Sequence, residues 1–167
     1  MYLARDMELG TFWAIKQLPL SMKKEAELLR RLNHSSLPRM TDYTEQDDKC
    51  YLVMEYIKGK SLNEYLKTNN LLSFEEILTI TRTILQIFQY LHSQKPPIYY
   101  GDLKPENLMR TESGKIYLVD FGSALYSYGT VRKNIKGTKG YAAPEQYQGM
   151  LLSLIHISEP TRHLRIS

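Results

Sequence analysis

The chain has little cysteine and no long apolar run, and each of these features excludes a class of protein. Cys50 is the single cysteine among 167 residues, so an internal disulfide is excluded and a reducing compartment is expected. No apolar run reaches the roughly 18–20 residues of a membrane-spanning helix, and no basic-then-apolar start predicts a signal peptide. We therefore expect a cytoplasmic location, although a part of the parent protein outside these residues can still carry a membrane anchor.

A large excess of charge is also absent. The formal net charge is only +4, which is too small to indicate nucleic acid as a partner. Hydrophobic residues make up 43% of the chain and charged residues 24%, which is ordinary for a folded globular protein. The length fits one domain with a buried core, and nothing in the sequence indicates an oligomeric state.

Hydrophobic spacing predicts strands early in the chain and mostly helix with short strands later. Apolar residues recur at helical spacing over residues 74–93, and the wide apolar stripe indicates that this helix is buried on most sides. The expected strands cover residues 2–4, 11–16, 51–56, 98–100, 107–109 and 116–119.

Serines predict three helix starts, because a serine side chain satisfies an unpaired backbone N–H at a helix N-terminus. Ser21 is expected to cap a helix over residues 22–32. At the other two starts a glutamate follows three residues later, which is typical of a reciprocal capping box. These two pairs are Ser61 with Glu64 and Ser73 with Glu76.

Four short motifs occur in one order along the chain. They are Trp-Ala-Ile-Lys at residues 13–16, Gly-Asp-Leu-Lys-Pro-Glu-Asn at 101–107, Asp-Phe-Gly at 120–122 and Ala-Pro-Glu at 143–145. Together they resemble the signature set of protein kinases, which comprises a strand lysine, a catalytic loop, a metal-binding loop and the end of the activation segment. The resemblance runs from about residue 2 to 148 and points to serine/threonine kinases of bacterial type.

This resemblance implies an α+β, two-lobed kinase-like fold with ATP in the cleft between the lobes. Residues 1–57 would form a partial N-lobe with the hinge, and residues 58–149 a partial C-lobe with the catalytic loop and activation segment. The fold is expected to be incomplete, since no Gly-x-Gly of a glycine-rich loop occurs and the first strand is missing. Trp13 is the only tryptophan, so the Asp-x-Trp motif and the C-terminal helices of the family are missing as well.

Two further expectations follow from the incomplete match. Residues 150–167 resemble nothing in the family and are expected to be a non-native tail. The helix over residues 74–93 would lack the helices that normally cover it, so its apolar face would be exposed.

The resemblance assigns a role in phosphoryl transfer to five residues. Asp102 would accept the proton of a substrate hydroxyl, and Lys104 would offset charge on the transferring phosphoryl group. Asn107 and Asp120 would hold Mg²⁺, which prefers hard oxygen ligands. Thr138 lies in the stretch that resembles the substrate-receiving segment, and with Lys104 it matches the serine/threonine-specific branch.

The resemblance also defines an ATP site. Lys16 would reach the α- and β-phosphates and Glu25 would pair with it, whereas Glu27 would face the opposite side of the helix. The expected adenine-site residues are Ala14, the gatekeeper Met54, the hinge residues Glu55 to Ile57, and Met109. The apolar residues expected to link the lobes are Leu29, Met40, Tyr100 and Phe121.

Two features of the catalytic region leave alternatives open. Tyr100-Gly101 stands where the family usually has His-Arg, so regulation by phosphorylation of the activation segment is not implied. Between Asp120 and Glu145 the segment carries four basic residues and no acid, which could attract an acidic peptide or could form a solvated loop. The basic residues are Arg132, Lys133, Lys136 and Lys139.

The resemblance therefore implies a serine/threonine protein kinase that transfers the ATP γ-phosphate to a protein Ser/Thr hydroxyl, with Mg²⁺, and that is impaired in this form. A pseudokinase-like interaction module without catalysis is one alternative. A small-molecule phosphotransferase is another. Retention of Lys16, Glu25, Asp102, Asn107 and Asp120 favours the first function over a pseudokinase.

Overall fold

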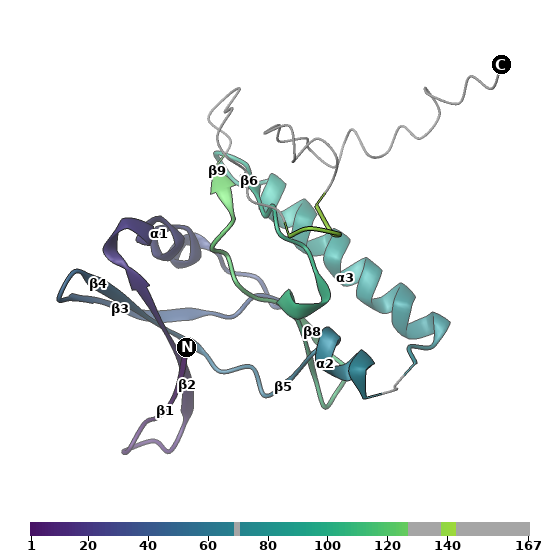
Figure 1. Ribbon diagram of the computed structural model, residues 1–167, viewed down its shortest axis with the longest axis horizontal. Helices are drawn as coiled ribbons and strands as arrows, with labels where there is room; N and C mark the ends of the chain where they lie inside the picture. The colour runs from purple at the N-terminus through teal and green to yellow at the C-terminus, as the bar shows by residue number, and fades with distance from the viewer. Residues whose placement is uncertain (69–70, 127–137, 143–167) are drawn as a thin grey trace. The chain divides into compact units, whose positions relative to one another are not determined.

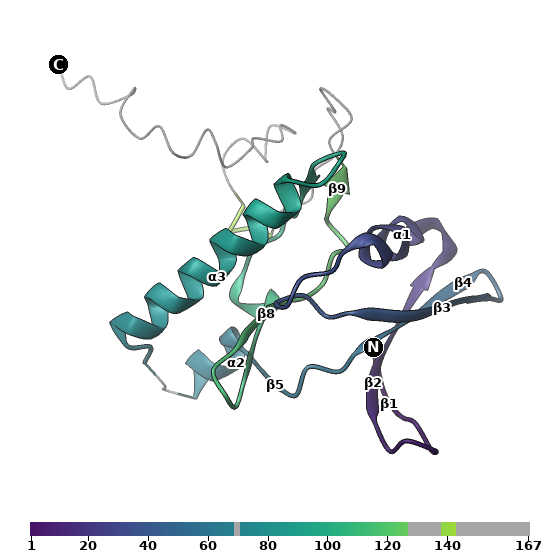
Figure 2. The same ribbon diagram turned by 180° about the vertical axis from the view of Figure 1, so that it is seen from behind.

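The computed structural model describes residues 1–68, 71–126 and 138–142. Within these residues the chain forms two compact units. The first joins Met1–Tyr90 to Lys104–Gly122, and the second joins Leu91–Leu103 to the residues described from Ser123 onward. Figures 1 and 2 show their elements from opposite sides. The expected lobe boundary after residue 57 stays a prediction.

A four-stranded antiparallel sheet forms the first part of the first unit (Figure 1). Burial alternates along the strand over Lys49–Glu55, so that Cys50, Leu52 and Met54 point into the core. In sheet order the strands are β1 (Tyr2–Arg5), β2 (Phe12–Pro19), β4 (Lys49–Glu55) and β3 (Met40–Gln46).

The strands expected at residues 2–4, 11–16 and 51–56 are confirmed by β1, β2 and β4. The strand β3 was not predicted, because its residues are mostly polar and five of its seven positions are exposed. Backbone pairing with β4 stabilises β3 although its side chains do not favour a strand, because strand propensity depends strongly on the neighbouring strand.

The helix expected over residues 22–32 is confirmed as α1 (Lys24–Arg31), which buries one apolar face. The expected cap at Ser21 is wrong. Leu20–Met22 form a 3₁₀ turn, and Lys23 occupies the N-cap position without a side-chain hydrogen bond. Ser21 therefore lies inside the turn rather than at the start of the helix.

The first unit also contains a three-stranded sheet, and the end of the expected catalytic loop at Asn107 runs directly into one of its strands. Gly59 is required there, because a Cβ at this position would lie 2.3 Å from the carbonyl oxygen of Arg110. In sheet order the strands are β5 (Gly59–Ser61), β7 (Leu108–Thr111) and β8 (Ile116–Leu118), and the short helix α2 (Leu62–Lys67) follows β5.

Both predicted capping boxes are confirmed. The Ser61 hydroxyl accepts the N–H of Glu64 at 3.2 Å, and the Glu64 carboxylate accepts the N–H of Ser61 at 2.8 Å. Ser73 and Glu76 form the same reciprocal pair at 3.2 and 2.9 Å. Each box satisfies two backbone donors that would otherwise lack a partner at the helix start.

The long helix α3 (Phe74–His92) confirms the predicted helix, but the expectation that it is buried on most sides is wrong. Ile87 is fully buried, whereas Phe74 is 73% exposed and Leu85 is 57% exposed. The exposure of Phe74 and Leu85 agrees with the expectation of an exposed apolar face on this helix. None of the helices among the described residues combines the length and apolar character needed to cross a membrane.

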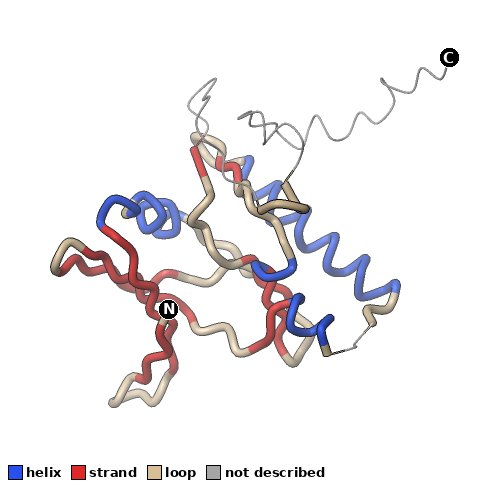
Figure 3. The backbone as a smooth tube through the Cα atoms, in the orientation of Figure 1, coloured by secondary structure: helices blue, strands red, loops and turns tan. Residues whose placement is uncertain are grey.

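The second unit contains two short paired strands, shown in red in Figure 3. β6 (Ile98–Tyr99) pairs antiparallel with β9 (Leu125–Tyr126). The strands expected at 98–100, 107–109 and 116–119 are confirmed by β6, β7 and β8. β9 is only two residues long and was not predicted.

Candidate active site

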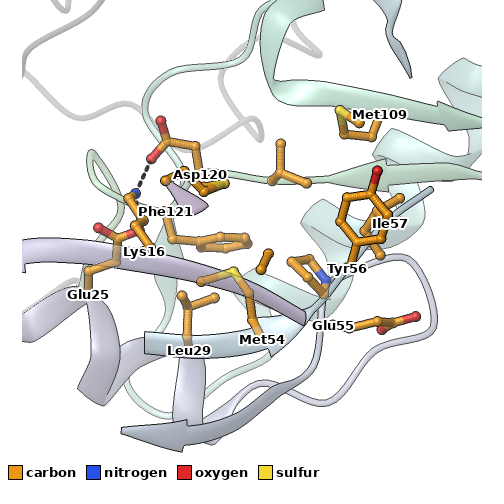
Figure 4. Close-up of a pocket in the computed structure, with 14 residues that line it drawn as sticks. Lys16, Glu25, Leu29, Met54, Glu55, Tyr56, Ile57, Met109, Asp120 and Phe121 are labelled. Carbon is orange, nitrogen blue, oxygen red and sulfur yellow. Dashed lines mark hydrogen bonds and ion pairs between the residues drawn. The ribbon is translucent and has the colours of Figure 1, made fainter. Parts of the chain in front are cut away.

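A cavity of about 150 Å³ lies wholly within the first unit (Figure 4). Its walls come from the four-stranded sheet, from α1, and from the strand β7 with the segment after β8. Every residue expected to bind ATP lines it, although these residues are spread over more than ninety positions of the chain. These residues are Ala14, Lys16, Glu25, Met54, Glu55, Ile57 and Met109, and Asp120 from the expected metal site joins them.

Strand register places the apolar wall of the cavity. Ala14 on β2 lies directly opposite Met54 on β4, so a small and a flexible side chain share one face of the sheet. The chain leaves β4 at Glu55 and continues through Tyr56 and Ile57 along the cavity edge. Met109 approaches from β7.

Some lining residues were not assigned to the ATP site from the sequence. Pro38 and Val119 line the cavity, and Leu29 and Phe121, which were expected to link the lobes, line it as well. Val119 directly precedes Asp120, so its position beside the metal-binding motif is the one signal that could have found it. An isolated apolar residue otherwise looks the same in a sequence whether it lines a cavity or fills a core.

A cluster of three charged side chains lies at one end of the cavity (Figure 4). The Lys16 Nζ atom lies 2.6 Å from Glu25 Oε1 and 2.8 Å from Asp120 Oδ1. The Glu25 side chain is only 3% exposed and that of Asp120 is 50% exposed. Glu27 is exposed, so α1 presents Glu25 and not Glu27 to Lys16.

Electrostatics keep the Lys16 ammonium charged. Burial lowers the pKa of Lys16, but hydrogen bonds to Asp120 and Glu25 outweigh burial, so the pKa is raised. Burial also raises the pKa of Glu25, and Lys16 opposes this shift only in part. Lys16 is therefore a fixed cation held by one buried carboxylate and one partly exposed carboxylate.

The Asp-Phe-Gly segment is held in a special backbone conformation. Asp120 has φ of 63°, in the left-handed region that few residues other than glycine adopt. Its Oδ1 atom accepts the N–H of Gly122 at 3.2 Å, and Phe121 is 1% exposed. A Cβ at Gly122 would lie 3.3 Å from Asp120 Oδ1, so glycine leaves room for the carboxylate.

Asn107 is tied to the same segment through the backbone. It ends a 3₁₀ turn (Pro105–Asn107) that follows Lys104, and its carbonyl oxygen accepts the N–H of Val119 at 2.9 Å. Asn107 is 5% exposed. An amide oxygen and a carboxylate are hard donors of the kind that Mg²⁺ prefers, so the chemistry of Asn107 and Asp120 fits that ion.

Asp102 belongs to the second unit and has a hydroxyl partner there. The Thr138 hydroxyl donates to Asp102 Oδ1 at 2.6 Å. The Thr138 carbonyl oxygen accepts the N–H groups of Tyr141 and Ala142 at 3.0 and 2.9 Å, which closes a turn around it. Tyr100, two residues before Asp102, is buried.

The expected catalytic loop is thus divided between the units, with Asp102 in the second and Lys104 and Asn107 in the first. Of the four apolar residues expected to link the lobes, Leu29, Met40 and Phe121 belong to the first unit and Tyr100 to the second. Several predicted features lie outside the described residues. They are Ala143-Pro144-Glu145, the basic residues Arg132, Lys133 and Lys136, and the tail over 150–167.

Comparison with known proteins agrees with these motifs. The protein kinase domain model matches residues 1–152. Serine/threonine-protein kinase B of Synechocystis sp. is 36% identical over 137 residues, covering 74% of this chain and 24% of that protein. Serine/threonine-protein kinase PrkC of Bacillus subtilis is 34% identical over 164 residues, covering 90% and 25%.

Serine/threonine-protein kinase D of Synechocystis sp. is 36% identical over 138 residues, covering 76% of this chain and 26% of that protein. The chain therefore spans about a quarter of the length of the curated relatives it matches. The family model covers most of the chain, and three of the signature residues, Lys16, Glu25 and Asp120, line one cavity and contact one another. The chain belongs to the protein kinase family, as a serine/threonine kinase domain of bacterial type.

Proposed function

We propose that this chain transfers the γ-phosphoryl group of ATP to a serine or threonine hydroxyl of a protein. The observation that carries the proposal is the arrangement of the cavity in Figure 4, where apolar walls lead to the Lys16–Glu25–Asp120 cluster. An apolar slot with charged groups at one end suits a ligand with a flat ring and a polyphosphate. A cytoplasmic location remains part of this proposal.

The adenine ring would lie between Ala14 and Met109, with Met54 behind it and backbone groups from Glu55 to Ile57 along its edge. Lys16 would then approach the α- and β-phosphates. Because Glu25 is buried and bonded to Lys16, it fixes the ammonium in place before ATP arrives. A preorganised cation lowers the cost of crowding negative phosphate charge.

Asn107 and Asp120 would hold Mg²⁺, which supplies neutralisation of the charge on the phosphate oxygens. The Asp120 side chain is half exposed, so its carboxylate would be accessible to the ion. Glu25 would hold Lys16 from the buried side.

In the transfer step the substrate hydroxyl oxygen forms a bond to the γ-phosphorus. The bond from that phosphorus to the β,γ-bridging oxygen breaks, ADP leaves with the electron pair, and Asp102 accepts the hydroxyl proton. The 2.6 Å bond from the Thr138 hydroxyl supports this role, because it presents to Asp102 the same donor as a substrate threonine. Lys104 would offset charge on the transferring group.

We also propose that transfer by these 167 residues is slow. No Gly-x-Gly occurs in the sequence, so no glycine-rich loop supplies backbone N–H groups over the phosphates. The expectation that residues 150–167 are non-native stays a prediction, and resequencing of the gene would test it.

The proposal is tested by incubating the purified chain with labelled ATP and Mg²⁺ and a mixture of serine- and threonine-containing peptides. Labelled peptide that disappears with Asp102→Asn and with Glu25→Gln, but persists with the exposed control Glu27→Gln, is the expected result. Label on an amino sugar or a choline-like alcohol alone would assign a small-molecule phosphotransferase. ATP binding without transfer to any acceptor would assign an interaction module.

A further inference from the structure

The residue directly before Asp102 has an unusual backbone. Gly101 has φ of +79°, in the left-handed region where a residue with a Cβ is strained. Asp102 follows it and accepts the Thr138 hydroxyl, so the conformation of Gly101 sets the direction in which the chain delivers the Asp102 carboxylate.

Gly101 also lies against another part of the backbone. A Cβ at this position would lie 3.1 Å from the carbonyl oxygen of Ser123. Ser123 leads toward β9, and β9 pairs with β6 immediately before Tyr100 and Gly101. The close approach therefore lies at the end of the β6–β9 pair, where the catalytic loop begins.

This crowding distinguishes Gly101 from the other described glycines with positive φ. Gly114 has φ of +82°, but a Cβ there would meet only the flexible end of the Arg110 side chain, at 3.9 Å. A Cβ at Gly140 would meet nothing within 4 Å. Among these glycines, Gly101 is the one whose missing side chain admits a neighbouring backbone.

We infer that Gly101 is a positioning residue for Asp102. This inference rests on the proposed function and deepens it. The lack of a Cβ lets the catalytic-loop backbone contact Ser123, and that contact holds Asp102 where it receives a hydroxyl proton, without any side chain at position 101. A Cβ would displace either the loop or the start of β9, and would move the Asp102 carboxylate away from its hydroxyl donors.

The test compares Gly101→Ala and Gly101→Asn with the matched control Gly114→Ala. Asparagine tolerates the left-handed region, so Gly101→Asn keeps the crowding with less backbone strain and guards against a failure to fold. Displacement of a catalytic group by about 1 Å costs on the order of 10²-fold in rate, so both Gly101 variants should lose kcat on that scale. The KM for ATP should stay within about twofold, because all residues lining the cavity belong to the other unit.

The control Gly114→Ala carries the same left-handed penalty in the turn between β7 and β8, in the first unit, and should keep kcat. Wild-type kcat in both Gly101 variants would overturn the inference. Equal losses of kcat in Gly101→Asn and Gly114→Ala would overturn it too, because a general loss of stability would then explain the effect.

Amide hydrogen exchange separates this inference from the proposed function, because it needs no phosphoryl transfer. Gly101→Asn should accelerate exchange in the β6–β9 pair, and Gly114→Ala should not. If the wild-type chain transfers no phosphate, the proposed function fails, and accelerated exchange confined to Gly101→Asn would still support the positioning of the loop. Unchanged exchange in Gly101→Asn would overturn the inference in either case.

Discussion

In the first unit Lys16 lies between two carboxylates, whereas in the second unit Asp102 follows a glycine with positive φ. Lys16 lies on an eight-residue strand, between a buried and a half-exposed carboxylate. Asp102 follows the two-residue strand β6 in the chain and accepts a hydrogen bond from the Thr138 hydroxyl. The comparison teaches that ion pairs can preorganise the proposed ATP-binding part, while a hydroxyl hydrogen bond and a close backbone approach occur in the proposed hydroxyl-handling part.

The largest expected effect comes from replacing the carboxylate of Asp102 with a neutral side chain of the same size. Asp102→Asn should lower the rate of phosphoryl transfer by about 10²–10⁴-fold, because the amide cannot accept the hydroxyl proton. The rise in melting temperature caused by Mg·ATP should persist, since no cavity residue changes. Labelled-phosphate transfer and a thermal melt measure the two effects. Loss of the ATP-dependent rise would contradict the separation of the two parts.

Removing the Lys16 cation should abolish the response to Mg·ATP, which the Asp102 variant should keep. Lys16→Met leaves Glu25 buried without its ion-pair partner, which costs roughly 3 kcal/mol of unfolding free energy, the lower end for a broken buried pair. The lower end applies because burial already raises the pKa of Glu25, so the carboxyl can take up a proton. Chemical denaturation measures the change, and Mg·ATP should no longer raise the melting temperature.

Lys24→Met is the matched control for Lys16→Met. Lys24 begins α1 and is exposed, so the variant loses the same charge without uncovering a buried carboxylate. It should change the unfolding free energy little and should keep the response to Mg·ATP. Equal destabilisation by the two variants would show that the ion pair between Lys16 and Glu25 contributes no more to stability than an exposed lysine does.

Removing the Thr138 hydroxyl should lower kcat by a smaller factor than removing the Asp102 carboxylate. Thr138→Val removes the hydroxyl that donates to the carboxylate at 2.6 Å and keeps the branched shape. A hydrogen bond to a charged group contributes about 1.5–3 kcal/mol, so kcat should fall by at least about tenfold if this bond orients Asp102. Thr138→Ser keeps the hydroxyl and should restore most of kcat. A Val variant as active as wild type would remove Thr138 from the catalytic arrangement.

The same contrast explains how much could be predicted from the sequence. Motif residues such as Lys16 and Asp120 are distinctive in type and spacing, so their meeting in one cavity could be predicted although 104 residues separate them. The capping boxes could be predicted because both partners lie within one helical turn. The Ser21 cap could not, because the 3₁₀ turn before α1 depends on backbone bonds that any residue can make.

Burial and backbone contacts were harder to predict than motifs. The pattern of α3 identifies its apolar face, but whether Phe74 or Leu85 is covered depends on what other elements pack there. The backbone geometry of Gly101 was equally hidden, because a glycine in a sequence does not reveal its φ or the approach of Ser123. Tertiary contacts of this kind carry no local signature.

The smallest expected effect lies at the start of α3, in the first unit. Hydrogen bonds from the Ser73 backbone and side chain, with Arg110 nearby, hold the pKa of Glu76 below its ordinary value of 4.5. Because the folded-state pKa is lowered, the carboxylate contributes stability above pH 4.5, and this contribution is lost as pH falls through the folded-state pKa. Glu76→Gln should therefore lower the melting temperature at pH 7 by roughly 2 °C, and the difference from wild type should shrink as pH falls through the folded-state pKa. Glu75→Gln removes a neighbouring charge from the same helical turn and should show a smaller change at pH 7. An altered kcat in Glu76→Gln would contradict the expectation that this carboxylate acts on stability alone, and would weaken the contrast between the two proposed parts.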